Sequence, residues 1–144
     1  MKRFTQCVCV ILVLAAILTI PAFAAEAIGE RASAYFFKYS AYIYRVSSTK
    51  FEVWFDVTAV DTMNKLGAKE IKVQRSSNGD YWTTMATYDM DDYSQMIDEN
   101  TIQHDECVSY NYLSGYQYRA VVVFYAKKGS SYGELTVTTS IFES

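Results

Sequence analysis

Histidine and cysteine are scarce in this chain of 144 residues, and their scarcity limits the chemistry that it can perform. His104 is the only histidine, and Cys107 is the only cysteine beyond the first ten residues. Cys107 lies three positions after His104, so a strand would point them to opposite faces, whereas a Cys-His dyad needs hydrogen-bond contact. His-Glu-x-x-His, Cys-x-x-Cys and glycine-rich phosphate loops are also missing. We therefore expect a solvated His104, no transition-metal site and a protein that is not an enzyme.

Positive charge is also in short supply. The 13 Lys and Arg residues are outnumbered by 16 Asp and Glu residues, which gives a formal net charge of −3. Proteins that bind nucleic acids need clustered positive charge to contact the phosphates. The sequence therefore predicts that the protein does not bind nucleic acid.

The N-terminus has the order of a secretory signal peptide, which consists of a basic start, an apolar run and small residues. Lys2 and Arg3 precede the apolar residues 7–20, a run shorter than the roughly 20 residues of a membrane-spanning helix. We place cleavage after Ala24, with Ala25 as the alternative. Residues 1–24 are then the signal and residues 25–144 one secreted domain without a membrane span. Cleavage would leave 11 basic and 16 acidic residues. The sequence contains no Asn-x-Ser/Thr site for N-glycosylation, which favours a bacterial origin.

Cys107 has no internal disulfide partner once the signal is removed. A lone cysteine in an exported protein is a buried apolar side chain, an intermolecular link or a reactive thiol. The sequence leaves these three states open.

Alternating apolar and polar residues predict an all-β domain. Residues 51–59 show the clearest period of two, and Tyr118 to Phe124 repeat the pattern. Asn78 and Gly79 predict a two-residue hairpin turn, and we expect a loop over residues 61–68. The interval 89–106 is expected to be loop or helical turn until a strand begins. The seven expected strands lie at 35–44, 51–59, 71–75, 81–85, within 101–110, and at 116–126 and 135–141. This spacing predicts a seven-stranded antiparallel sandwich of two sheets.

Two segments resemble fibronectin type III and Ig-like domains. The strand, turn and Trp82 of residues 71–88 resemble a hairpin of that fold, and Leu113 to Phe124 resemble the corner before a late strand. The resemblance implies that the hydroxyl of Tyr118 bonds to the backbone a few residues upstream. The Trp-bearing hairpin and the Gly-Tyr-x-Tyr-Arg run also resemble a family of small exported proteins of Gram-positive bacteria. The lack of proline after Pro21 and the acidic interval 89–106 depart from the fibronectin pattern.

An acidic cluster is a candidate calcium site. Asp89, Asp91 and Asp92 could supply three of the oxygen ligands that calcium prefers. Their spacing matches no EF-hand, and a solvated acidic loop explains the same residues. In a fibronectin-like order, this loop would lie at one pole opposite Lys65, Lys127 and Lys128. No other cofactor is predicted.

Aromatic side chains form the second candidate site. The chain has 13 tyrosines, more than one core of this size can bury. Trp54 alternates with buried residues and is expected to be exposed, with Tyr42 and Tyr44 as neighbours. Exposed rings stack on sugars and anchor protein interfaces, although aromatic residues on strands also pack against one another.

These observations predict a secreted, non-enzymatic binding module for a protein or glycan ligand at the cell exterior. The alternative is a structural cell-surface protein that associates with itself. In that case the aromatic strand 35–44 would pair along a sheet edge with a second copy.

Overall fold

The computed structural model describes residues 34–144, so the predicted signal peptide lies outside the described residues. None of the helices in this part of the chain is long and apolar enough to span a membrane. The elements are β1 (Phe36–Arg45), β2 (Lys50–Ser76), β3 (Thr83–Asp89), the 3-10 turn η1 (Ser94–Met96), β4 (Ile97–Asn111), β5 (Gln117–Lys128), β6 (Ser131–Thr138) and β7 (Phe142–Glu143).

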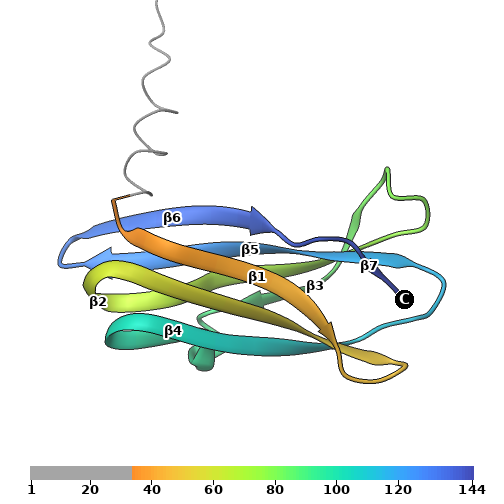
Figure 1. Ribbon diagram of the computed structural model, residues 1–144, viewed down its shortest axis with the longest axis horizontal. Coiled ribbons are helices and arrows are strands. Elements are labelled where there is room, and N and C mark those ends of the chain that lie inside the picture. Colours follow the sequence, from red (N-terminus) through yellow and green to blue (C-terminus); the bar gives the residue numbers. More distant parts are fainter. Residues whose placement is uncertain (1–33) are drawn as a thin grey trace, which may run out of the picture.

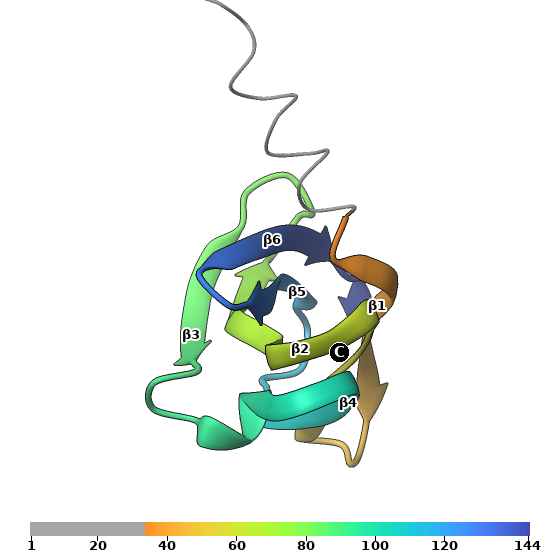
Figure 2. The same ribbon diagram turned by 90° about the vertical axis from the view of Figure 1, so that its left-hand side faces the viewer.

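The long strand β2 organises the sheet. Its first half pairs with β1 on one side and β4 on the other, and its second half pairs with β3 and β5. Strands β6 and β7 both pair with β5. All pairs are antiparallel, and the seven strands form one continuous sheet that runs lengthwise in Figure 1 and curls round in the end view of Figure 2. The all-β, antiparallel prediction is confirmed.

The predicted inner faces form the core. Phe51, Val53 and Val57 are fully buried on β2, as are Tyr118 and Phe124 on β5. They are buried because successive side chains of a strand point to opposite faces, and the curled sheet encloses one of them. The buried apolar residues are Phe36, Phe51, Val53, Phe55, Val57, Ala59, Met63, Leu66, Ala68, Ile71, Val73, Met96, Val108, Tyr112, Tyr118, Ala120, Val122, Phe124 and Ala126.

The loop predicted over residues 61–68 is wrong. The predicted strands 51–59 and 71–75 are parts of β2, which continues through the interval. Met63, Leu66 and Ala68 are buried there, and this burial keeps the segment on the core. Register shifts after Thr58 and after Ala68 allow β2 to change partners along its length. Such irregularities bend a strand without ending it.

The predicted hairpin at residues 71–88 is present, but its two-residue turn is wrong. Arg75 pairs with Thr83, which leaves a longer connection between β2 and β3. The Oγ of Ser76 accepts a hydrogen bond from the backbone N–H of Gly79 at 2.8 Å. The indole N–H of Trp82 donates to the Gly79 carbonyl at 3.0 Å. These bonds satisfy the polar groups of a wider turn, in which Gly79 adopts a φ of +82°.

Tyr118 makes the bond that was predicted for it. Its hydroxyl donates to the Leu113 carbonyl at 3.2 Å and accepts from the Leu113 backbone N–H at 3.1 Å. The ring lies edge-on to Phe51, with centroids 5.5 Å apart. Tyr118 therefore ties the corner before β5 to the core under β2. The acidic interval 89–106 follows its prediction only in part: η1 supplies a helical turn, but β4 begins at Ile97, ahead of the strand predicted within 101–110.

Candidate functional site

The predicted aromatic residues lie on the outer face of three neighbouring strands, β1, the first half of β2, and β4. We call this surface the aromatic face. Tyr42 pairs with Trp54, which pairs with Cys107, and Tyr44 pairs with Glu52. Directly opposed residues of an antiparallel pair project on the same side, so the structure brings all three predicted ligand-binding residues together. Their polar neighbours on this face are Lys38, Ser40, Glu52, Asp56, Thr58, Gln103, Asp105 and Ser109.

Trp54 is half-buried, and the prediction of an exposed indole is wrong in this respect. Its Nε1–H donates to the Glu52 Oε2 at 3.0 Å, and this bond lays the indole along the sheet. Tyr42 and Tyr44 are the open rings of the aromatic face, with 50% and 59% of their surface exposed. The face therefore offers two exposed phenols beside one anchored indole.

Carboxylates surround these rings. The Asp56 Oδ2 lies 3.4 Å from the Lys38 Nζ. The Asp56 Oδ1 is buried and has no hydrogen-bond partner among the described residues. A buried carboxylate oxygen without a partner is uncommon, because an ionised carboxylate accepts bonds at both oxygens. Asp105 pairs with Asp56 on the next strand. The aromatic face is therefore a negatively charged surface that can accept hydrogen bonds from a ligand.

Cys107 occupies the β4 side of the aromatic face and is partly buried. Burial, together with the carboxylates of Glu52 and Glu106, raises the pKa of its thiol to about 11. A nucleophilic cysteine instead needs a lowered pKa and positive surroundings. The thiol is therefore protonated at neutral pH and poorly suited to covalent catalysis.

The acidic residues proposed for calcium take part in a turn. The Asp89 Oδ1 accepts the Asp91 backbone N–H at 3.0 Å, and the Asp89 carbonyl accepts from the backbone N–H groups of Asp92 and Tyr93. Within residues 34–144, no three or more Asp, Glu, His or Cys side chains gather where they could hold a metal ion. The carboxylates of Asp89, Asp91 and Asp92 are thus not assembled as a site.

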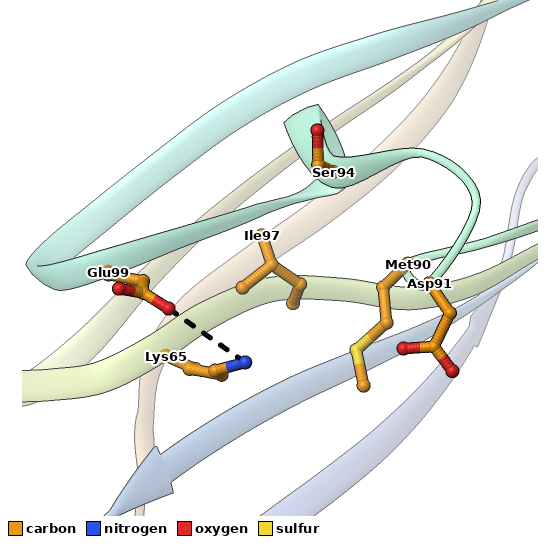
Figure 3. Close-up of a pocket in the computed structure, with 6 residues that line it drawn as sticks. All are labelled: Lys65, Met90, Asp91, Ser94, Ile97 and Glu99. Atoms are coloured by element: carbon orange, nitrogen blue, oxygen red, sulfur yellow. Dashed lines mark ion pairs between the residues drawn. The ribbon is translucent and has the colours of Figure 1, made fainter.

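A hollow of about 290 Å³ lies beside this acidic turn (Figure 3). Lys65 and Glu99 line it and form an ion pair with 3.9 Å between Nζ and Oε1. Met90 and Ile97 supply apolar lining, and the Met90 side chain lies between the Asp91 carboxylate and the Lys65–Glu99 pair in the view of Figure 3. Lys65 therefore contacts the acidic interval through Glu99. Lys128 pairs instead with Asp61.

His104 is half-buried, so the prediction of a solvated histidine is wrong. Its ring lies 5.6 Å from that of Phe55, and its Nε2 is 2.9 Å from the Gln95 carbonyl oxygen. His104 pairs with the inward-facing Val57, whereas Cys107 pairs with the outward-facing Trp54. The two side chains therefore point to opposite faces, as predicted.

The sequence contains a short glycine-serine pattern that also occurs in hydrolases. Residues 129–133 read Gly-Ser-Ser-Tyr-Gly and match the Gly-x-Ser-x-Gly pattern of hydrolases. In those enzymes the serine lies between a strand and a helix. Here Ser131 begins β6, directly after the β5–β6 turn. The segment is a β-hairpin, which lacks the strand-to-helix geometry of a nucleophile elbow.

Comparisons of the chain with protein-family models, with curated proteins and with solved structures give no match. The site is therefore interpreted from its own geometry.

Proposed function

We propose that the chain is an exported, non-enzymatic binding module that takes a neutral glycan on its aromatic face. The observation that carries this proposal is the exposure of Tyr42 and Tyr44 at alternate positions of one strand, beside the anchored Trp54. Residues two apart on a strand are about 6.6 Å apart, so the two rings form a row along β1. Flat rings can stack on the apolar faces of sugars.

The charge of the aromatic face supports a neutral ligand. On the aromatic face, Glu52 and Asp56 of β2 and Asp105 of β4 outnumber Lys38 of β1. These carboxylates would repel an anionic polymer, and they can accept hydrogen bonds from sugar hydroxyls. The Asp56 side chain keeps 28% of its surface exposed, so part of its carboxylate lies within reach of such a donor. A protein ligand is the other class predicted from the sequence, and the experiment below distinguishes the two.

The same proposal includes a two-layered, fibronectin type III-like arrangement of the sheet. One layer would be β1, the first half of β2, and β4, and the other would be β3, the second half of β2, β5 and β6. The change of partners along β2 supports this division. The hydrogen bonds between Tyr118 and Leu113 also support it, because such a tyrosine corner is typical of these sandwiches. Export rests on the signal-like residues 1–24.

The test is a titration of the purified protein with a panel of neutral, cationic and anionic polysaccharides, read by calorimetry. We expect a neutral polysaccharide to bind, and Tyr42→Ala and Tyr44→Ala to weaken that binding. Loss of an aromatic anchor worth about 2 kcal/mol corresponds to an affinity about thirtyfold lower.

Tyr81→Ala is the matched control, because Tyr81 is an 81% exposed tyrosine outside the aromatic face. Its affinity should stay within about twofold of the unsubstituted protein. Preference for an anionic polymer, or equal losses at Tyr81 and Tyr42, would contradict the proposal. A defined protein ligand that depends on Tyr42, with no glycan bound, would favour the protein class.

The self-associating alternative is favoured by a different observation, the state of the β1 edge, which is argued next.

A further inference from the structure

Strands β1 and β4 are the two outer edges of the three strands that form the aromatic face, and backbone hydrogen bonds fix how each is oriented. The Val46 backbone N–H donates to the Lys50 carbonyl, at the end of the β1–β2 ladder. Because bonding alternates along an antiparallel ladder, the even-numbered residues of β1 bond to β2. Tyr39, Ala41 and Ile43 therefore turn their backbone N–H and C=O groups to the outer edge.

The β4 edge is blocked by side chains of β4 and β3. The Tyr112 backbone N–H donates to the Thr49 carbonyl, which by the same alternation turns the odd-numbered residues of β4 outwards. The Cys107 N–H is taken by the Glu106 Oε1 at 2.9 Å, and the Ser109 carbonyl by the Tyr88 hydroxyl at 2.7 Å. Four carboxylates lie along β4, at Asp98, Glu99, Asp105 and Glu106. Charges and blocked backbone groups are the devices that protect an edge from added strands.

The β1 edge is less protected: it carries the charges of Lys38 and Arg45, but its backbone groups are not blocked. Within residues 34–144, no side chain forms a hydrogen bond to a backbone group of Phe36–Arg45. The strand contains neither proline nor glycine. β1 shares no ladder with β6 among the described strands, and Figure 1 shows β1 running away from β6 after its first residues. The close contact at that end is the Tyr35 ring against Gly133.

We propose that the occupant of this edge is β1 of a second copy, added antiparallel about a two-fold axis at Ala41. In this register Ala41 faces its own equivalent, and Tyr39 exchanges backbone bonds with Ile43 of the second copy. The backbone N–H and C=O groups of Tyr39, Ala41 and Ile43 face outwards in both copies. In this register the donors and acceptors of one edge therefore lie opposite those of the other. The association is isologous and closes as a dimer.

The side chains of the aromatic face fit this register. Lys38 lies opposite Tyr44 of the second copy, within the range of a cation–π contact, and Ser40 lies opposite Tyr42. The two Lys38 residues are six positions apart along the joint, roughly 20 Å, so they do not repel closely. A head-to-tail joint between β1 and β4 would instead have to displace the Glu106 and Tyr88 caps. The caps on β4 and the fit of Lys38 to Tyr44 thus favour the β1–β1 pair.

The joint would merge two aromatic faces into one six-stranded surface with Tyr42 and Tyr44 of both copies near its centre. This inference goes beyond the proposed function, because its partner is a second copy and its contact is a strand edge. Glycan binding and dimerisation can therefore fail independently.

The experiment is sedimentation velocity on the purified protein over a concentration series, with Ala41→Pro as the test variant. Proline at Ala41 removes an N–H that faces outwards, and proline is tolerated on edge strands. We expect a concentration-dependent dimer whose dissociation constant rises at least tenfold in Ala41→Pro. Asp105→Pro, at the equivalent outward position of β4, is the control and should leave the dimer unchanged. A monomer at all concentrations, or a dimer lost in Asp105→Pro but kept in Ala41→Pro, would overturn the proposal.

A cross-link tests the register without proline. Ala41→Cys in a Cys107→Ser background should form a disulfide-linked dimer on mild oxidation, because opposed residues of a bonded pair are about 5.5 Å apart at Cα. On non-reducing electrophoresis, Asp105→Cys in the same background should run as a monomer. A dimer that links through position 105 and not through position 41 would show that the wrong edge was chosen.

Discussion

The two halves of β2 bury one face in the same way and differ on the other. In the first half, Phe51, Phe55 and Val57 are at most 1% exposed, and in the second half Ile71 and Val73 are fully buried. Both inner faces follow the same alternation and reach the same core. The halves therefore contribute alike to the fold, and any difference in function must come from their outer faces.

On the outer face of the second half, polar groups bond to one another. Lys72 pairs with Glu70 at 2.7 Å. The Arg119 Nε–H donates to the Gln74 Oε1 at 2.8 Å, while the guanidinium lies 4.3 Å from the Trp82 ring. A surface whose charges and rings are already paired has little left to offer a ligand.

On the outer face of the first half, groups remain available. Tyr42 and Tyr44 are half exposed or more, so two phenol rings stay open to a ligand. The outer face of the first half thus keeps open rings, whereas the polar groups named for the second half bond to one another. This contrast is the reason for assigning the binding site to the first half of β2 and its neighbours.

The largest effect should come from the shared inner face. Phe55→Ala is expected to lower the free energy of unfolding by about 3–5 kcal/mol, and Ile71→Ala by about 2–5 kcal/mol, because each leaves a cavity in a packed core. Urea denaturation, monitored by tryptophan fluorescence, measures the unfolding free energy of both variants. Thr84→Ala, on the exposed β3, is the control and should change stability by less than about 0.5 kcal/mol. A cost below 1 kcal/mol at either core position would break the equivalence of the two halves.

The next effect concerns the residue that joins the halves. Tyr118→Phe keeps the ring against Phe51 but removes both hydrogen bonds to Leu113, so we expect a loss of about 1–3 kcal/mol. The same denaturation experiment measures it. Tyr110→Phe is matched, because its ring also packs against Phe51 while its hydroxyl forms no hydrogen bond to the described residues. Equal losses in the two variants would mean that the corner bond adds nothing to stability.

The inner faces could be predicted from the sequence because alternation is a local signal. The pattern of residues 51–59 correctly gave the buried side of β2, and Tyr118 to Phe124 gave that of β5. The continuation of β2 through residues 61–68 could not be predicted in this way. Its buried Met63 and Leu66 are irregularly spaced, and they are held by strands distant in sequence.

The arrangement of side chains on the aromatic face could not be predicted from the alternation of apolar and polar residues. The sequence named Tyr42, Tyr44 and Trp54, but only the register places Tyr42 directly beside Trp54. The half-burial of Trp54 follows from its bond to Glu52, two residues away on the same strand. The unpartnered oxygen of Asp56 was missed, because a polar residue at an outward position gives no sign of whether its neighbours satisfy it.

The smallest expected effect concerns the pKa of the Cys107 thiol, which reports on the negative charge of the aromatic face. Burial first, and then the Glu52 and Glu106 carboxylates, raise its pKa from the ordinary 9.0 to about 11. Because the raised pKa favours the neutral thiol in the native state, its stabilising contribution is complete below pH 9 and is lost as the pH rises towards 11. Alkylation by iodoacetamide at pH 8 should be at least about tenfold slower than in a cysteine peptide, since each pKa unit changes the thiolate fraction tenfold.

Glu52→Gln separates the contribution of charge from that of burial. Removing this carboxylate should lower the pKa of Cys107 and speed its alkylation, whereas Glu134→Gln, on β6, should leave the rate unchanged. Rates measured from pH 7 to pH 11 give both pKa values directly. If Cys107 titrates near 9 in the unsubstituted protein, the carboxylates do not make this face strongly negative. The exclusion of anionic ligands from the first half of β2 would then lose its electrostatic basis, and the contrast between the two outer faces would rest on the exposed rings alone.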